Sequence, residues 1–210
     1  MKHLSFTILF LLAFFQLSAQ FNPEAVDLIK PVSESILNSS GVSADFVFTL
    51  ENKQKELSET DSGKLVLQGN KYHLSVMGTE TYFDGTTQWV HMVDEEEVNI
   101  SNPDPDDKME LTPVNLFTLY EQGFRFRIVE EKGNEATIDM FPDDKDMPYY
   151  KIRLVIDKAA KLFKAVEAYG RDGVDTKVEI KNMQKGLNLN ESEFVFNSSQ
   201  HPDVEIIDMR

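Results

Sequence analysis

The chain of 210 residues contains no cysteine. This absence excludes disulfide frameworks, thiol nucleophiles and zinc sites built on cysteine. Histidine is scarce too, with four residues in all, and the sequence forms neither an HxH pair nor an HExxH motif. The motifs GxSxG, SxxK, GxxxxGK and GxGxxG are also absent. The sequence therefore indicates a protein that is not an enzyme and has no catalytic residue, metal or cofactor.

Positive charge is also in short supply, with 21 Lys and Arg against 36 Asp and Glu and a formal net charge of -15. Such a surface repels a phosphate backbone, so nucleic acid is excluded as a partner. The same charge keeps a protein soluble and attracts basic patches on a protein partner. Beyond residue 20, no apolar run approaches the length of a membrane span.

The first twenty residues have the three-part plan of a secretory signal peptide. A short basic start precedes a nearly continuous apolar run from Leu4 to Leu17, and the small residues Ser18 and Ala19 follow. The run, of about 14 residues, is shorter than the ~20 of a membrane span, although an uncleaved anchor helix is the alternative. We expect residues 1–20 to be a cleaved signal peptide, 21–210 to be a single domain, and the product to be periplasmic.

A one-sided helix is predicted after the signal peptide. Asn22 is a suitable cap, Pro23 suits the first helical position, and Gly41 is expected to end the helix. Pro31 lies inside the pattern and is expected to kink or split it. The apolar positions recur at helical spacing and must lie on an apolar surface: Ala25, Val26, Ile29, Val32, Ile36 and Leu37.

A second helix is predicted between Thr112, as its cap, and Gly123, as its stop, with Pro113 at the first helical position. Its apolar residues cover most of the helical perimeter, which indicates burial on more than one side. Two interpretations stay open. The helix is either a plug that belongs to the core of the sheet, or a lid over a cavity.

The rest of the chain alternates with a period of two from Ser43 onward. We count about eleven short strands, separated by turn signals such as Asp84-Gly85 and Asp172-Gly173. Their regular spacing predicts a mainly β protein with some α, in which an antiparallel meander curls into a barrel or a sandwich.

One hairpin, 81–92, contains the only Trp. A two-residue Asp-Gly turn would pair Phe83 with Thr86. It would place Phe83, Val90 and Met92 on one face and Tyr82, Trp89 and His91 on the other. We expect the face of Phe83 and Met92 to point inward.

A series of landmarks runs the length of the chain after the signal peptide. In order, they are SADF, GKL, KYHL, FDGTTQWV, TPVNLF, FRFRI, LVID, FVF and PDVEIID. Each is weak alone, but in this order and spacing the chain resembles the outer-membrane lipoprotein carrier protein (LolA) family.

The resemblance implies an incomplete, unclosed antiparallel β-barrel of about eleven strands, lidded by short α-helices. It also implies a periplasmic carrier that takes acylated lipoproteins from an inner-membrane ABC-type release complex. Such a carrier delivers its clients to an outer-membrane acceptor or to the membrane itself. We expect it to act as a monomer without a cofactor.

The faces of the strands and helices then give the expected site. The cavity is predicted to be lined by Phe46, Phe48, Leu65, Leu67, Tyr72, Leu74, Val76, Phe83, Val90, Met92 and Phe126. The lid is predicted to contain Ile29, Val32, Ile36, Leu116, Phe117 and Tyr120.

One segment departs from the family. Well-characterised members carry an Arg between the two early strands that holds the lid by hydrogen bonds, whereas this turn reads Gln68-Gly69-Asn70, and Lys71 is a loose substitute. Three other functions stay open: an envelope sensor on the same fold, a binding protein for another lipid or glycolipid, and a hydrolase with an unrecognised site.

Overall fold

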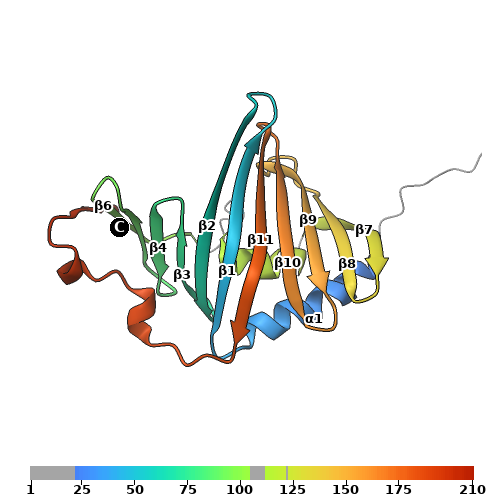
Figure 1. The fold of residues 1–210 in the computed structure, drawn as a ribbon, viewed down its shortest axis with the longest axis horizontal. Coiled ribbons are helices and arrows are strands. Elements are labelled where there is room, and N and C mark those ends of the chain that lie inside the picture. Colours follow the sequence, from blue (N-terminus) through green and yellow to red (C-terminus); the bar gives the residue numbers. More distant parts are fainter. Residues whose placement is uncertain (1–21, 105–111, 122) are drawn as a thin grey trace, which may run out of the picture.

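The computed structural model describes residues 22–104, 112–121 and 123–210, so the predicted signal peptide lies outside the described residues. One large sheet dominates the molecule (Figure 1). Its strands are β1 (Val42–Asn52), β2 (Leu57–Gln68), β3 (Lys71–Val76), β4 (Thr79–Phe83), β5 (Gln88–Met92), β6 (Glu97–Ser101), β7 (Phe124–Lys132), β8 (Glu135–Pro142), β9 (Tyr149–Asp157), β10 (Leu162–Gly170), β11 (Val174–Lys185) and β12 (Glu205–Asp208). The helices are α1 (Ala25–Leu37) and α2 (Pro113–Thr118), with 3-10 turns η1 (Leu119–Glu121), η2 (Glu191–Phe194) and η3 (Ser198–Gln200).

The strand order is β12-β6-β5-β4-β3-β2-β1-β11-β10-β9-β8-β7, so β12 and β7 are edges and the sheet does not close. This confirms the expected mainly β, unclosed barrel. The eleven predicted strands correspond to β1–β11, and all of their pairings are antiparallel. The twelfth strand is the exception, because β12 pairs with β6 in parallel.

Helix α1 begins at Ala25, two residues later than Pro23 would place it. Asn22 does not cap it. The backbone N–H of Asn22 donates to the carbonyl of Phe126 at 2.7 Å, and its Oδ1 accepts from the N–H of Ile128 at 3.1 Å, so Asn22 ties the chain to β7. Pro31 does not split the helix, which runs unbroken to Leu37. The expected one-sided burial is present.

Helix α2 is capped as predicted. Thr112 Oγ1 accepts a hydrogen bond from the N–H of Asn115 at 3.1 Å, and Pro113 occupies the first turn. The segment continues as η1, which ends at Glu121. Gly123, the predicted stop, has a φ of 67°, which is costly for residues with a Cβ. None of the described helices is long and apolar enough to cross a membrane.

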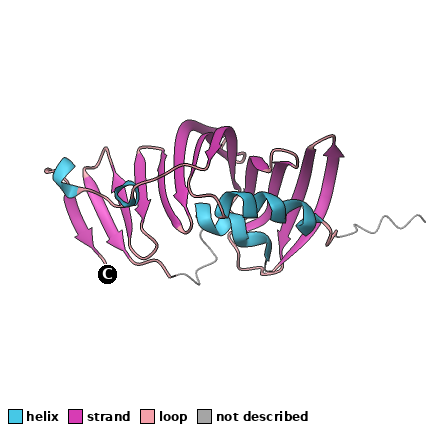
Figure 2. Cartoon of the chain, turned by 90° about the horizontal axis from the view of Figure 1, so that it is seen from below, coloured by secondary structure: helices cyan, strands magenta, loops and turns pink. Residues whose placement is uncertain are grey.

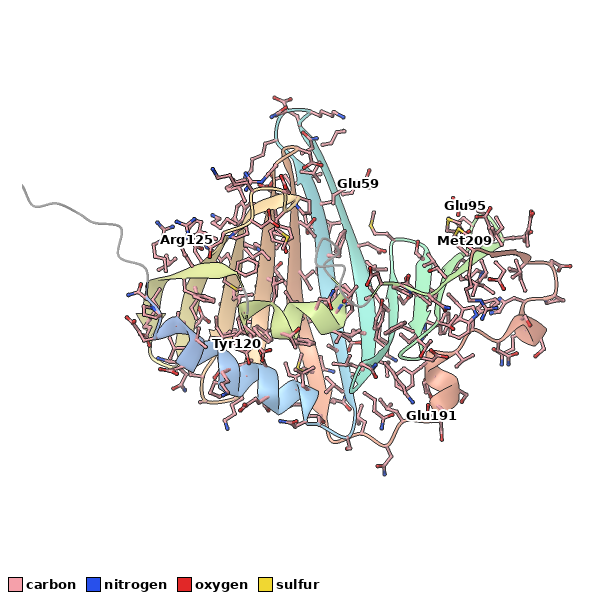
Figure 3. The ribbon with its side chains drawn as sticks, turned by 180° about the vertical axis from the view of Figure 1, so that it is seen from behind. Glu59, Glu95, Tyr120, Arg125, Glu191 and Met209 are labelled. Atoms are coloured by element: carbon pink, nitrogen blue, oxygen red, sulfur yellow. The ribbon has the colours of Figure 1, made fainter. Side chains whose placement is uncertain are left out.

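Both helices lie against one side of the sheet (Figure 2). We call this side the inner face; it bears Ala44, Phe46 and Leu65. Helix α1 contacts β7 and β10, and α2 contacts β3 and α1. Tyr120 lies between the two helices (Figure 3). The main apolar core therefore fills the space between the inner face and these helices.

The β4–β5 hairpin corrects one prediction. Phe83 pairs with Gln88 rather than with Thr86, so the connection has four residues instead of two. Asp84 Oδ1 closes it by accepting from the N–H groups of Thr86 and Thr87 at 2.9 and 2.8 Å. Because the difference is two residues, the alternation of faces is unchanged. Phe83, Val90 and Met92 share the inner face, as expected.

The opposite, outer face of β3–β6 is covered by the C-terminal segment, residues 186–204. Phe196 packs with Val98 and Ile100, and Trp89 borders this second cluster. His91 also faces it, with its ring 5.2 Å from that of Phe196 and 4.8 Å from that of His201. The two halves of the sheet are therefore covered on opposite faces.

The outer face of β7–β9 is polar and is tied together by one carboxylate. Asp139 is fully buried and accepts from Arg127 Nη2 at 2.6 Å and from Arg153 Nε at 2.7 Å. Burial alone would raise the pKa of Asp139, but the hydrogen bonds from Arg153 and Arg127 outweigh it and lower the pKa below its usual value. The carboxylate therefore stays charged and links three strands.

His91 is a buried titratable side chain beneath the C-terminal segment. The side chain is 3% exposed, and its Nδ1 has no hydrogen-bond partner within the described part of the chain. Burial, and secondarily His201, lower the pKa of His91, while Glu80 opposes them. The folded protein thus binds fewer protons here than the unfolded chain. We expect the free energy of unfolding to fall as the pH drops below about 6.5.

Urea unfolding followed by Trp89 fluorescence, at about pH 7.5 and about pH 5.5, measures this effect. His91→Phe keeps an aromatic ring but cannot be protonated, so it should show a smaller loss of stability between the two pH values. An equal loss in both proteins would contradict a role for His91.

Candidate functional site

An apolar hollow of about 190 Å³ lies between the inner face of the sheet and α2. Its described walls come from five strands, from α2 and from the residue that caps this helix, Thr112. Among the described residues that line it, all side chains are apolar except those of Thr112 and Thr176. They are Ala44, Phe46, Phe48, Leu65, Leu74, Val76, Thr112, Pro113, Leu116, Phe117, Phe163, Val166, Ala168, Thr176, Val178, Ile180 and Met183.

The sheet side of the hollow is shaped by a large residue opposite a small one. Phe46 on β1 pairs with Gly63 on β2. A Cβ at Gly63 would come within 2.2 Å of the Phe46 ring and 2.9 Å of the carbonyl oxygen of Ser75. The Phe46 ring therefore occupies the space beside Gly63 where the side chain of any other residue would begin.

The helix side of the hollow is made by Leu116 and Phe117. Phe117 is buried, and its ring centroid lies 5.5 Å from that of Phe163 on β10. The contacts that carry this packing are apolar and involve a helix of six residues. A helix this short has little stability of its own, so its position depends on these contacts.

The predicted cavity residues are divided among several places. Phe46, Phe48, Leu65, Leu74 and Val76 line the hollow. Tyr72 and Phe83 line a neighbouring trough. Leu67 and Phe126 are buried in the main core but do not line the hollow. Val90 and Met92 share the inner face but belong to neither apolar cluster of the described residues, and they line neither the hollow nor the trough.

The predicted lid residues are divided in the same way. Leu116 and Phe117 line the hollow, and Tyr120 packs between the helices. Ile29, Val32 and Ile36 belong to α1 and are each 1% exposed, against the sheet. The structure thus separates a deeply buried helix, α1, from a short one, α2, that covers the hollow.

Strands β10 and β11 supply wall residues that the sequence-based list does not contain, namely Phe163, Val166, Ala168, Val178, Ile180 and Met183. Val166 and Ala168 alternate on one face of β10, and Val178 and Ile180 do so on β11. Phe163 and Met183 are each three residues from these pairs, across register shifts that break the alternation. The sequence does not predict which strand β11 pairs with. Its partner is β1, more than a hundred residues away, and no local pattern specifies such a pairing.

A second, more polar trough of about 610 Å³ adjoins the hollow along the inner face of β3–β6. Thr112 lines both spaces. No group of three or more His, Asp and Glu side chains within the described ranges is arranged to hold a metal ion.

The β2–β3 turn, which departs from the family, makes its side-chain contacts away from α2. Gln68 Nε2 donates to the carbonyl of Ser40 at 2.8 Å. Lys71 Nζ forms an ion pair with Glu191 in η2, on the outer face. Lys71 therefore points away from α2 and is not a substitute for a lid-holding Arg.

The comparisons with known proteins agree with this architecture. A family model described as Outer membrane lipoprotein carrier protein LolA matches residues 15–173. No curated protein matches the chain in sequence. An uncharacterized conserved protein from Thermus thermophilus has a similar structure, with 12% identity, a TM-score of 0.59, and coverage of 88% of this chain and 99% of that one. At this identity the likeness shows the fold alone.

Two further solved structures are similar at lower scores. A LolA superfamily protein from Nitrosomonas europaea has 12% identity and a TM-score of 0.44, covering 82% of this chain and 97% of that one. A DUF1329 family protein from Desulfovibrio piger has 13% identity and a TM-score of 0.44, covering 83% and 96%.

Gly63→Ala tests the close packing of the hollow wall. The added methyl group should displace the Phe46 ring and destabilise the protein by about 1–3 kcal/mol, as overpacking does. Urea unfolding measures the change. In a Phe46→Leu background, Gly63→Ala should be less harmful, because the side chain it meets is smaller. Equal effects in both backgrounds would contradict the contact.

Proposed function

Because the chain belongs to the family described as outer membrane lipoprotein carrier protein LolA, we propose that it carries lipoproteins and buries their acyl chains in the hollow beneath α2. The observation that carries this proposal is an apolar hollow covered by one short helix on an open sheet. A core with a purely structural role packs closely and leaves few voids larger than a water molecule.

The physical need for such a carrier follows from the acyl chain. Each buried CH₂ contributes about 0.8 kcal/mol, so a chain of sixteen carbons exposed to water is unfavourable by on the order of 12 kcal/mol. A lipoprotein cannot cross an aqueous compartment with its chains exposed. Its carrier must cover the chains and still release them.

The small volume of the hollow indicates how uptake and release of an acyl chain are balanced. At about 190 Å³ it is smaller than the roughly 300–1,000 Å³ of ordinary ligand pockets. We infer that α2 moves away when the ligand enters, so that Leu116 and Phe117 compete with the acyl chain for the same wall. The net affinity is then the difference between ligand binding and lid packing. Helix α1, with three side chains each 1% exposed, stays in place.

The proposed partners follow from the family and the charge. The clients are acylated lipoproteins received from an inner-membrane ABC-type release complex and passed to an outer-membrane acceptor or the membrane itself. The net charge of -15 attracts basic patches on such partners. Residues 1–20 direct export to the periplasm, and the protein acts there as a monomer without catalysis.

Depletion of the protein in its host, followed by separation of the two membranes, tests the function. Lipoproteins should accumulate in the inner membrane. Unchanged sorting would refute the carrier, and mass spectrometry of the molecules that copurify identifies the alternative. A free lipid or glycolipid without attached protein would favour a binding protein for that lipid.

Leu74→Glu and Phe117→Glu test the hollow itself. A carboxylate in either wall should lower the affinity for a fluorescent acyl probe by about ten-fold or more, because the charge must be desolvated when a chain binds beside it. Leu57→Glu is the matched control, since Leu57 is exposed at the tip of the β1–β2 hairpin.

Far-ultraviolet circular dichroism shows whether each variant is folded. Unfolding of both Leu74→Glu and Phe117→Glu would mean that these residues belong to an ordinary core. Folded variants with full probe binding would place the acyl chain elsewhere.

A further inference from the structure

The polar trough beside the hollow has a chemistry of its own. It runs along the inner face of β3–β6 and is about three times the volume of the hollow, at about 610 Å³ against 190 Å³. Amide and hydroxyl side chains dominate its polar lining, and the described lining includes one carboxylate, Asp104. The amide and hydroxyl residues are Asn70, Tyr72, Thr86, Gln88, Ser101, Asn102, Thr112 and Asn115.

The floor of the trough is ordered before any ligand arrives. Gln88 is 9% exposed, and its Nε2 donates to the hydroxyl of Tyr72 at 3.0 Å. The Tyr72 ring lies 5.4 Å from that of Phe83. At the margin, Thr87 Oγ1 donates to Asn102 Oδ1 at 3.1 Å. A buried amide held in this way keeps a fixed orientation.

One wall of the trough depends on a glycine. Gly85 has a φ of 99°, and a Cβ there would lie 3.0 Å from Nδ2 and 3.2 Å from Oδ1 of Asn70. The β4–β5 turn and the β2–β3 turn therefore approach each other closely. Both the backbone angle and the close contact favour glycine at this position. The approach of the two turns places the Asn70 amide at the rim.

The position of the trough relates it to the hollow. Thr112 lines both spaces, and the first turn of α2 separates them, with Val114 facing the trough and Pro113 facing the hollow. A molecule with an apolar part and a neutral polar part could occupy both at once. Side-chain amides and hydroxyls both donate and accept hydrogen bonds, as the repeating N–H and C=O groups of a polypeptide require.

We propose that the trough holds the polypeptide segment that follows the acylated residue of a client lipoprotein. This rests on the proposed function, since it assigns the acyl chains to the hollow. The polypeptide must leave the hollow, because its backbone groups would be unsatisfied among apolar walls. The trough begins where the hollow ends and offers these groups partners on the same face of the sheet.

Thr86→Trp tests this assignment by filling the trough with a large side chain. Thr86 is exposed, so the core is unaffected. The probes are a tripalmitoylated cysteine followed by a neutral Ser-Asn peptide, and palmitic acid alone. The variant should bind the lipopeptide about ten-fold more weakly, and palmitic acid within about two-fold of the original protein.

Thr60→Trp is the matched control, because Thr60 is exposed on the outer face of β2. It should bind both probes normally. An equal loss of both probes in Thr86→Trp, or no loss of either, would overturn the trough assignment while leaving the carrier function intact. If the original protein bound neither probe, both proposals would fail together.

Photocrosslinking gives a second measurement that does not depend on affinity. A photoreactive amino acid at Ser101 should capture the peptide part of the lipopeptide, and one at Thr60 should not. Crosslinks from Ser101 to the acyl chains alone would overturn the assignment. Equal capture of a palmitoylated disaccharide would identify the trough as a site for polar head groups in general, and would overturn the assignment to peptide.

Discussion

The inner face of the open sheet has to be kept from water, and the rest of the structure depends on how this is achieved. An unclosed sheet cannot cover its own apolar face, as a closed barrel does. Helix α1 covers part of it with almost fully buried side chains, and α2 covers another part with Leu116 and Phe117. The second cover is short and incomplete, which leaves a hollow and makes its exchange for a ligand physically reasonable.

The outer face obeys the same constraint in a different way. Over β3–β6 it is covered by the C-terminal segment, with Phe196 at the centre of a small apolar cluster. Over β7–β9 it needs no cover, because Asp139, Arg127 and Arg153 make it polar. As a result, α2 and the C-terminal segment lie on opposite faces, and movement of one does not require movement of the other.

Much of this architecture could be predicted from the sequence because the patterns involved are local. Alternation predicted β1–β11, and Thr112 and Pro113 predicted the start of α2. The predicted faces of the β4–β5 hairpin were correct, although the predicted turn was two residues too short. Strand β12 was missed because its four residues hydrogen-bond to β6 from a distant part of the chain.

The site was harder to predict than the fold. Five of the predicted cavity residues line the hollow, but Val90 and Met92 do not, since alternation gives the face of a residue and not its distance from a helix. The contribution of Val178 and Ile180 depends on the pairing of β11 with β1. The engagement of Lys71 with Glu191 depends on a segment 120 residues away.

One edge of the sheet, β7, is partly covered by a preceding part of the chain, and the other edge is a short strand, β12. Asn22 hydrogen-bonds to β7 at one margin, and β12 pairs with β6 at the other. Unpaired strand edges promote aggregation, and short, charged outer strands such as Glu205–Asp208 discourage it. Deleting or extending the chain beside Asn22 or β12 would therefore lower the solubility of the protein first, although neither segment lines the hollow.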